Sequence, residues 1–349
     1  MRPAAFQGRR KSMKQNKALA AILCAAAFCA APFAVSAQDH VMKISAPIPA
    51  TEKDPVYAWM VAFERGVEER SEGRIDVQLY PSNQLGQLPA AIEGVSMGTI
   101  EASFSIIGFF SSLDPRFRVL DAGGLFETPE QAMRSFQQPE VREMLAEFGA
   151  AAGVQPLVVV VDGQGVIISK DPIETVADFR GKKVRSGGAT PLLNEPLKAV
   201  GAAPVAMPLG EVLPALQTET IDAATNSMAV VNGFQMADVA RNVTYLPGTF
   251  TIIGAVVNRD FLATIGPELA QIVMEEAQKA ESVVLAHLEN VAAQEKAWED
   301  SGGRVIRMGD EEAATYLETT GSIVAGIVAG DAQMQADYDI LGAAAAAVK

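Results

Sequence analysis

The sequence predicts an α/β protein of two domains, joined by crossover strands and a long bridging helix. Three observations lead to this expectation. Residues 41–107 alternate short strands and helices in the order β-α-β-α-β, which is typical of an α/β domain with a largely parallel sheet. The β-branched run Val158–Val161 is typical of a strand covered on both faces, and Asp162–Gly165 interrupts it. Residues 267–300 keep helical spacing throughout, which corresponds to a helix of about 50 Å at 1.5 Å per residue.

Local signals justify the first elements. Asp54 offers an N-cap and Pro55 a first-turn proline for an amphipathic helix that ends before Gly73. Residues 74–80 alternate apolar and polar side chains, as a half-buried strand does. Short strands are also expected over residues 41–45 and 99–107, with a turn at 81–86 leading into a second helix between them.

A second unit follows the interruption at Asp162–Gly165. Residues 182–185 read as a strand, so Arg185 comes at its carboxyl end, and Thr190 and Pro191 begin the next helix. The remaining expected elements are a helix over 191–200, a strand over 205–207, a helix over 210–218, a strand over 251–257, a strand over 304–308, a helix start at Asp310 and a terminal helix or frayed end over 343–348. The expected domains are 38–162 with 251–285 (domain I), and 163–250 with 286–349 (domain II).

Residues 1–37 read as a secretory signal peptide. They contain six basic side chains and no acidic ones, then an apolar run from Ala18 to Val35 and small residues up to Ala37. A transmembrane anchor is the weaker interpretation, because the run is alanine-rich and ends in a cleavage motif. We therefore expect cleavage after Ala37 and a soluble exported protein. Whether Met1 or Met13 starts the chain, and which export route it takes, stay open.

The composition excludes several function classes. The two cysteines, Cys24 and Cys29, precede the cleavage point, so no disulfide or thiolate nucleophile is expected after it. Without residues 1–37 the chain carries 22 basic and 42 acidic side chains, a net charge of about −20 that repels nucleic acid and anionic membranes. His40 and His287 are the two histidines. No catalytic, metal-binding or cofactor motif is found, and a binding protein is favoured over an enzyme.

Arg185 and Asn226 are the residues most indicative of function. Ligands of open α/β sheets bind at the carboxyl ends of the strands, which is where Arg185 is expected. A guanidinium there can hold a carboxylate by two parallel hydrogen bonds. Asn226 follows the helix expected over 210–218, so both side chains are expected at one cleft.

The chain resembles the periplasmic solute-binding subunits of tripartite ATP-independent periplasmic (TRAP) transporters, of the DctP type. The matching motifs cover nearly the whole chain after the signal peptide, in the right order. They are residues 73–86, 93–101, 117–126, 176–185, 200–208, 211–218, 221–222 and Asn226.

The resemblance implies the two-domain periplasmic binding protein fold, type II-like, closing over an organic acid. Arg185 matches the carboxylate-binding arginine of the family, and Asn226 matches an asparagine that contacts the ligand. The implied partners are the small and large membrane subunits of the transporter, and the implied location is the periplasm. A monomer is expected, with no cofactor, no metal ion and no nucleic acid.

Departures from the family pattern bear on the ligand. A second arginine of many members falls at Gly165, and the loop 105–110 carries no charge. The proline before the Phe126 region is also missing. The remaining site residues that we expect are Ile106, Phe109, Leu209 and Gln164. Together with a single arginine, the apolar side chains favour a monocarboxylate with an apolar body. A C4-dicarboxylate, with Gln164 or a backbone amide in place of the lost arginine, is the alternative. An exported hydrolase on the same scaffold is a third hypothesis.

Overall fold

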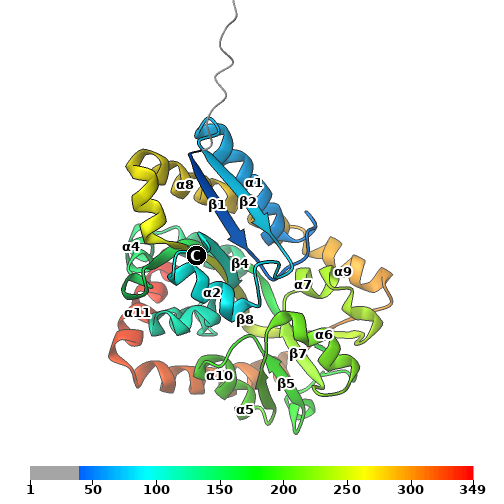
Figure 1. The fold of residues 1–349 in the computed structure, drawn as a ribbon. Helices are drawn as coiled ribbons and strands as arrows, with labels where there is room; N and C mark the ends of the chain where they lie inside the picture. The colour runs from blue at the N-terminus through cyan, green and yellow to red at the C-terminus, as the bar shows by residue number, and fades with distance from the viewer. Residues whose placement is uncertain (1–38, 349) are drawn as a thin grey trace, which may run out of the picture. The chain divides into compact units, whose positions relative to one another are not determined.

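The computed structural model describes residues 39–348, so the expected signal peptide lies outside the described residues. Within this range nine strands form one mixed sheet in the order β2-β1-β3-β8-β4-β7-β5-β6, with β9 paired to β8 (Figure 1). The strands are β1 (His40–Ser45), β2 (Ile75–Tyr80), β3 (Ala102–Ile106), β4 (Val154–Ser169), β5 (Lys183–Ser186), β6 (Ala203–Ala206), β7 (Ala223–Asn226), β8 (Asn242–Asn258) and β9 (Arg304–Arg307).

The helices cover this sheet and link its strands. They are α1 (Pro55–Arg70), α2 (Leu88–Ser96), α3 (Pro129–Phe136), α4 (Pro139–Ala146), α5 (Pro191–Ala199), α6 (Leu209–Gln217), α7 (Met228–Gly233), α8 (Arg259–Leu288), α9 (Val291–Asp300), α10 (Asp310–Ala329) and α11 (Ala332–Ala347). Two 3₁₀ segments, η1 (Ile107–Ser112) and η2 (Pro115–Asp121), follow β3. Among residues 39–348, no helix is both long and apolar enough to cross a membrane.

The expectation of a largely parallel sheet is only partly correct. Strands β1, β2 and β3 pair in parallel, as do β5, β6 and β7. The long strands β4 and β8 lie between these two sets and are antiparallel to each other and to their other neighbours on the path, β7 and β3. These two strands therefore connect the two parallel sets, as crossover strands were expected to do.

The sequence had indicated that the strand is interrupted at Asp162–Gly165, but β4 continues through these residues. Its pairing with β8 shifts register between Val161 and Gly163, and again between Gln164 and Val166. Gly163 has φ +148°, which a residue with a side chain rarely adopts, so the glycine permits the irregularity. The apolar residues from Val166 to Ile168 then continue the strand. The domain boundary expected at Asp162 coincides with these shifts, and the limits of the two domains stay a prediction.

The helix expected over 267–300, which at its length was expected to bridge both domains or to be kinked between them, is broken between Leu288 and Val291. Helix α8 ends at Leu288, and α9 starts at Val291 after Asn290, whose backbone leaves the helical region. Asparagine competes for hydrogen bonds in a helix interior and favours its ends. The His287 carbonyl oxygen accepts the Asn290 N–H at 3.1 Å and the Gln294 side-chain amide at 3.0 Å, so α9 is tied back to the end of α8. Gly266, with φ 81°, separates a short first segment from the main part of α8.

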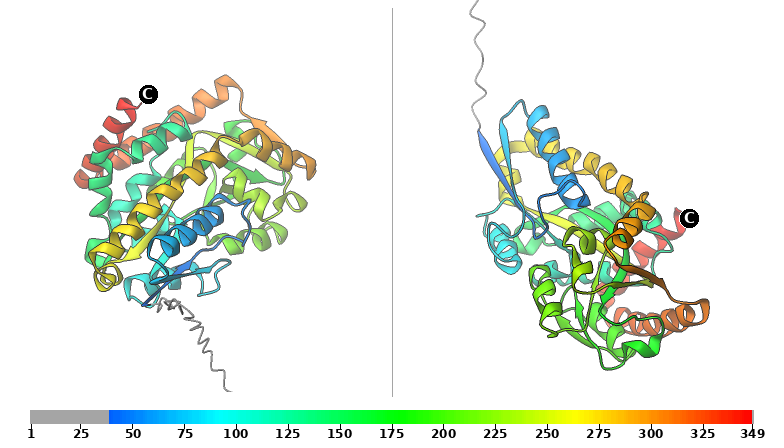
Figure 2. Two further views of the ribbon diagram at one scale, coloured as in Figure 1. Left: turned by 90° about the horizontal axis from the view of Figure 1, so that it is seen from above. Right: turned by 90° about the vertical axis from the view of Figure 1, so that its right-hand side faces the viewer.

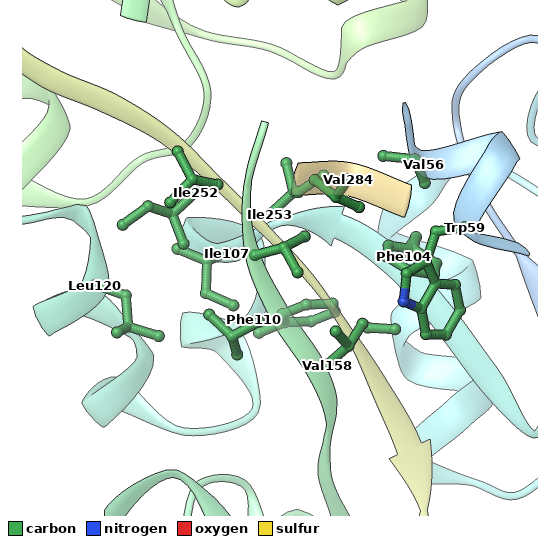
Figure 3. Packing of buried hydrophobic residues seen from close by; sticks show 14 of the residues in the cluster. Val56, Trp59, Phe104, Ile107, Phe110, Leu120, Val158, Ile252, Ile253 and Val284 are labelled. Carbon is green, nitrogen blue, oxygen red and sulfur yellow. The ribbon is translucent and has the colours of Figure 1, made fainter. Parts of the chain in front are cut away.

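Helix α1 forms as predicted and packs against α8 (Figure 2). The Asp54 carboxylate caps it by accepting the backbone N–H groups of Val56 and Tyr57. Trp59 of α1 donates its indole N–H to the Ala277 carbonyl oxygen of α8 at 3.1 Å. Its ring meets Phe104 of β3 edge to face at 4.9 Å, as Figure 3 shows. The core thus joins the first strands to the helix that follows the central strand β8.

The helix at the end of the described chain, α11, is longer than the sequence predicted. The residues expected as a helix or frayed end belong to its last turns. Arg116 of η2 holds the buried Asp337 of α11 by two hydrogen bonds of 2.9 and 2.8 Å. Gln131 of α3 donates to the Ala345 carbonyl oxygen at 2.9 Å. The terminal helix is therefore attached to η2 and α3 through specific polar contacts.

Candidate ligand-binding site

Arg185 is fully buried near the end of β5, at the carboxyl edge where the sequence places it. Its Nε donates to the Met207 carbonyl oxygen at 3.0 Å, and Nη1 donates to the Thr225 carbonyl oxygen at 2.9 Å. Nη2 is buried and has no hydrogen-bond partner among residues 39–348. Burial lowers the pKa of Arg185 to about 10, so the group stays charged at neutral pH. The guanidinium is thus fixed in orientation with donors left for an anion.

Asn226 comes after helix α6, as expected, and is the last residue of β7, a strand that the sequence had not predicted. Its side chain is 3% exposed, and neither Oδ1 nor Nδ2 has a partner among the described residues. Its backbone oxygen accepts the hydroxyl of Thr251 at 3.2 Å, which joins β7 to β8. Buried amides are nearly always hydrogen-bonded, so this one is an indicator of a binding site.

Two cavities meet at Asn226. The larger, of about 130 Å³, lies among β5, β7, β8, α5 and α10, and the smaller, of about 30 Å³, lies among β3, α7 and the segments leading into α1 and α6. Ile106, Asn226 and Thr251 line both. The larger cavity has a mostly apolar wall that includes Ile106, Phe126, Leu192, Phe250, Tyr316 and Val324.

Arg185 stands next to this shared wall. A Cβ atom built on Gly187 would lie 3.1 Å from Ile106 Cδ1 and 4.0 Å from Arg185 Nη1. Both side chains therefore approach the same glycine, which lines the larger cavity. Arg185 itself lines neither cavity, and its Nη1 approaches the larger one at Gly187.

The other expected site residues are only partly brought together. Ile106 lines both cavities and Leu209 lines the smaller one. Phe109, in η1, lines neither and packs against the core. The Gln164 side chain also lines neither, and its amide donates to the Leu246 carbonyl oxygen at 3.2 Å. Gln164 is therefore engaged with the backbone of the strand beside it.

Gly165, where many family members carry a second arginine, lines the larger cavity. A Cβ atom there would lie 2.8 Å from Thr249 Cγ2 and 3.3 Å from the Thr249 carbonyl oxygen. A larger residue at this position requires Thr249 to move. A glycine in place of the second arginine of the family therefore fits the close packing of Thr249, on the neighbouring strand, against Gly165.

Sequence reasoning missed three carboxyl groups that line the cavities: Asp121 in the larger and Asp54 and Asp162 in the smaller. Burial raises the pKa of Asp54 to about 7, of Asp121 to about 7 and of Asp162 to about 6. Asp54 was recognised only as a helix cap and Asp162 only as a strand break. Neither role indicates that a side chain faces a cavity, because that depends on the pairing of distant strands.

Helix α10 was also missed as a wall of the larger cavity. Tyr316, Leu317 and Val324 come from its length. The sequence indicated only where this helix starts, at Asp310, and the structure confirms that start. Among the described residues, no group of three or more histidine, cysteine, aspartate or glutamate side chains is placed to hold a metal ion.

Comparison with known proteins gives a consistent result. Residues 48–331 match the family described as bacterial extracellular solute-binding protein, family 7 (DctP). The 2,3-diketo-L-gulonate-binding periplasmic protein YiaO of Escherichia coli is 29% identical over 62% of this chain and 66% of its own length. The ectoine-binding periplasmic protein TeaA of Halomonas elongata is 28% identical over 74% of this chain and 76% of its own.

A solved structure shares the fold. A TRAP periplasmic solute-binding protein from Desulfovibrio salexigens, with bound orotic acid, superimposes with a TM-score of 0.81 at 22% identity. The match covers 88% of this chain and 99% of that one. At this identity the likeness establishes the two-domain binding-protein fold and not the ligand.

Proposed function

Because the chain belongs to the DctP family of bacterial extracellular solute-binding proteins, we propose that it captures an organic acid for a TRAP transporter. It works in the periplasm as a monomer, after cleavage of its signal peptide at Ala37. It holds the acid between two domains that close by a hinge motion, and delivers it to the small and large membrane subunits. No catalytic step is involved.

The observation that carries the proposal is that Arg185 Nη2 and the amide of Asn226 are both buried without a hydrogen-bond partner among residues 39–348. They come from the neighbouring strands β5 and β7, and Arg185 Nη1 bonds the residue next to Asn226. One N–H of Nη1 also remains after its bond to Thr225. The end of the guanidinium can therefore bind both oxygens of one carboxylate, while Asn226 Nδ2 donates to the same group. The net charge of the chain repels anions, so this local positive charge must supply the attraction.

A single carboxylate on an apolar body fits the cavities best. The wall of the larger cavity is mostly apolar, and its volume of about 130 Å³ accepts a small organic skeleton. Each buried methylene contributes about 0.8 kcal/mol, and a charge-assisted hydrogen bond contributes about 1.5–3 kcal/mol. Micromolar affinity, about 8 kcal/mol, is within the reach of these terms.

The alternative, a C4-dicarboxylate, requires a second anion-binding group. Gln164 was the candidate, and its amide is directed to Leu246. The close approach of Gly165 to Thr249 leaves little room for a compensating side chain at that position. Related proteins of E. coli and H. elongata are named for different solutes, so ligand identity is best settled by binding measurements.

Calorimetry tests the carboxylate clamp. Ligand-free protein is titrated with monocarboxylates such as cyclohexanecarboxylate and benzoate, and with succinate and malate. Arg185→Lys keeps the charge but loses the planar fork, and we expect it to weaken binding at least about tenfold. Arg180→Lys, an exposed arginine on the loop before β5, is the matched control.

Undiminished binding by a folded Arg185→Lys protein would contradict the clamp. Succinate or malate binding more tightly than every monocarboxylate would support the dicarboxylate alternative. Conversion of a bound acid, followed by mass spectrometry, would support the hydrolase hypothesis instead.

A further inference from the structure

The smaller cavity, which shares Asn226 with the carboxylate clamp, has two carboxyl groups in its wall. Asp54 precedes α1, and Asp162 lies in the irregular part of β4, so they come from segments more than 100 residues apart. Both are at least nine-tenths buried, at 2% and 5% exposure. The negative charge of Asp162 contributes to raising the pKa of Asp54.

Neither carboxyl group forms an ion pair among residues 39–348. Asp54 Oδ1 accepts the backbone N–H groups of Val56 at 2.9 Å and Tyr57 at 3.1 Å. Asp162 Oδ2 accepts the Ser227 hydroxyl. The base that acts on Asp162 electrostatically is His287 of α8, whose Nδ1 lies 3.0 Å from the Val283 carbonyl oxygen. One oxygen of each carboxyl group remains without a described donor.

Burying these two carboxyl groups in their charged form destabilises the ligand-free protein. Burial is the largest cause of the raised pKa of both groups, to about 7 for Asp54 and about 6 for Asp162. Near neutral pH the cavity therefore still carries negative charge, because Asp162 is mostly ionised there. Buried charges are usually paired, so the wall is suited to a positive group that comes from outside the chain.

Two further side chains in the same wall point to a ligand independently of the carboxyl groups. Ser105 Oγ and both amide atoms of Asn226 are buried, and none has a partner among the described residues. Each side chain belongs to a residue only 3% exposed that lines the smaller cavity. The hydroxyl and amide oxygens can accept N–H donors. Four side chains therefore offer acceptors to one small space.

The size of that space limits what it can hold. At about 30 Å³ it admits one small polar group and not the body of an organic acid. It shares Ile106, Asn226 and Thr251 with the larger cavity. A ligand whose carboxylate is bound by Arg185 can thus reach it with a neighbouring substituent.

We infer that the ligand is a zwitterion, whose protonated nitrogen occupies the smaller cavity between Asp54 and Asp162. This rests on the proposed function, since Arg185 and Asn226 hold the carboxylate of the same molecule. The amino acid or cyclic amino-carboxylate keeps its apolar skeleton in the larger cavity. Asp54 and Asp162 favour such a zwitterion over a carboxylic acid of the same shape that lacks the nitrogen.

The test uses pairs of acids that share a skeleton and differ in the nitrogen. The pairs are L-proline with cyclopentanecarboxylate, L-pipecolate with cyclohexanecarboxylate, and 5-aminopentanoate with pentanoate. Each is titrated by calorimetry into the wild-type chain, Asp54→Asn and Asp162→Asn. Asparagine keeps the acceptor for the helix cap and for Ser227 while removing the charge. Glu299→Gln, an exposed carboxylate of α9, removes one charge outside the cavities.

We expect the nitrogen-bearing member of at least one pair to bind the wild type at least about tenfold more tightly. That preference should fall to near unity in both asparagine variants and persist in Glu299→Gln. Equal or tighter binding of the plain acid in every pair overturns the inference, as does a preference that survives both variants or failure of all three nitrogen-bearing acids to bind. A polyhydroxylated acid that outcompetes the whole panel also overturns it.

These outcomes are separable from failure of the proposed function. Plain acids that bind the wild type and are lost in Arg185→Lys leave the clamp standing while the zwitterion inference falls. If binding of every acid is insensitive to Arg185→Lys, the clamp itself is wrong.

Discussion

Asn226 presents two buried polar atoms without partners among the described residues, and this has an energetic consequence. An unsatisfied buried polar group costs about 1–3 kcal/mol relative to a satisfied one. Asn258, on β8, is equally buried at 3% but is fully engaged. Its Nδ2 donates to the Val95 carbonyl oxygen at 2.9 Å, and its Oδ1 accepts the Phe261 N–H at 2.8 Å. The two asparagines form a natural matched pair.

Replacement of each by leucine should therefore have opposite effects. Asn226→Leu removes the unsatisfied groups and should raise the free energy of unfolding by about 1–3 kcal/mol, while abolishing binding of the organic acid. Asn258→Leu leaves the Phe261 N–H without its acceptor and should lower the same quantity by about 1–3 kcal/mol. Urea unfolding of the ligand-free proteins measures both. A clear loss of stability in Asn226→Leu would contradict this account.

At the scale of elements, α1 and α8 approach closely because Gly66 has no side chain. A Cβ atom there would lie 2.1 Å from Glu276 Oε2 and 2.8 Å from its Cδ. Glu276 is 3% exposed and paired with Arg70 Nη1 at 3.1 Å, so its head group has little freedom to move away. The glycine thus preserves an ion pair at the contact between the two helices.

Gly66→Ala should therefore lower the free energy of unfolding by about 1–3 kcal/mol, through overpacking and displacement of Glu276. Gly326, in α10, is exposed and would meet nothing within 4 Å. There the same substitution should raise stability by about 0.5–1 kcal/mol, because alanine is the better helix former. Thermal and urea unfolding compare the two variants. If both substitutions change the free energy of unfolding in the same direction, the contact with Glu276 does not determine the effect of Gly66→Ala.

Elements with local signals were predictable from the sequence, and elements that depend on distant pairing were not. Asp54 caps α1 and Pro55 begins it, and Pro191 begins α5 after Thr190, whose side chain makes no capping hydrogen bond. The continuation of β4 past Asp162 and the length of β8 were not foreseen, because partners on distant segments stabilise these residues. The break between α8 and α9 falls at Asn290 with no proline or glycine to signal it.

The candidate site divides in the same way. Arg185 lies at the strand end that its flanking glycines predicted, and its role in binding stays a prediction. Asp54 and Asp162 face one cavity only because α1 and β4 meet in the folded chain. No spacing within the sequence records that proximity.

At the scale of the whole molecule, the cavity carboxyl groups make stability depend on pH. Burial raises the pKa values of Asp54, Asp121 and Asp162 from 3.8 to about 7, about 7 and about 6. Between these values and 3.8 the folded chain binds more protons than the unfolded chain. Its free energy of unfolding therefore falls as pH rises through this window. The stabilising contribution is complete below pH 3.8 and lost above pH 7.

We expect the ligand-free protein to lose stability from pH 4.5 to pH 8, by up to about 1.4 kcal/mol for each unit of raised pKa. The triple variant Asp54→Asn, Asp121→Asn, Asp162→Asn should flatten this slope, and Glu299→Gln should leave it unchanged. Urea unfolding at several pH values provides the measurement. A slope that is equally steep in the triple variant would assign the pH dependence to the surface charge instead.

The position of β8 between β3 and β4 also dictates the order in which the chain can fold. Residues 102–106 and residues 154–169 are held on opposite sides of a strand that begins only at Asn242. A chain emerging from its N-terminus can pair β3 with β1 and β4 with β7, but the edges of β3 and β4 that face β8 stay unpaired until more than 240 residues have appeared. Pairing over such separations is slow and leaves strand edges open to wrong partners. A holding chaperone that binds extended apolar strands would thus find its longest open edge in β4 before β8 arrives.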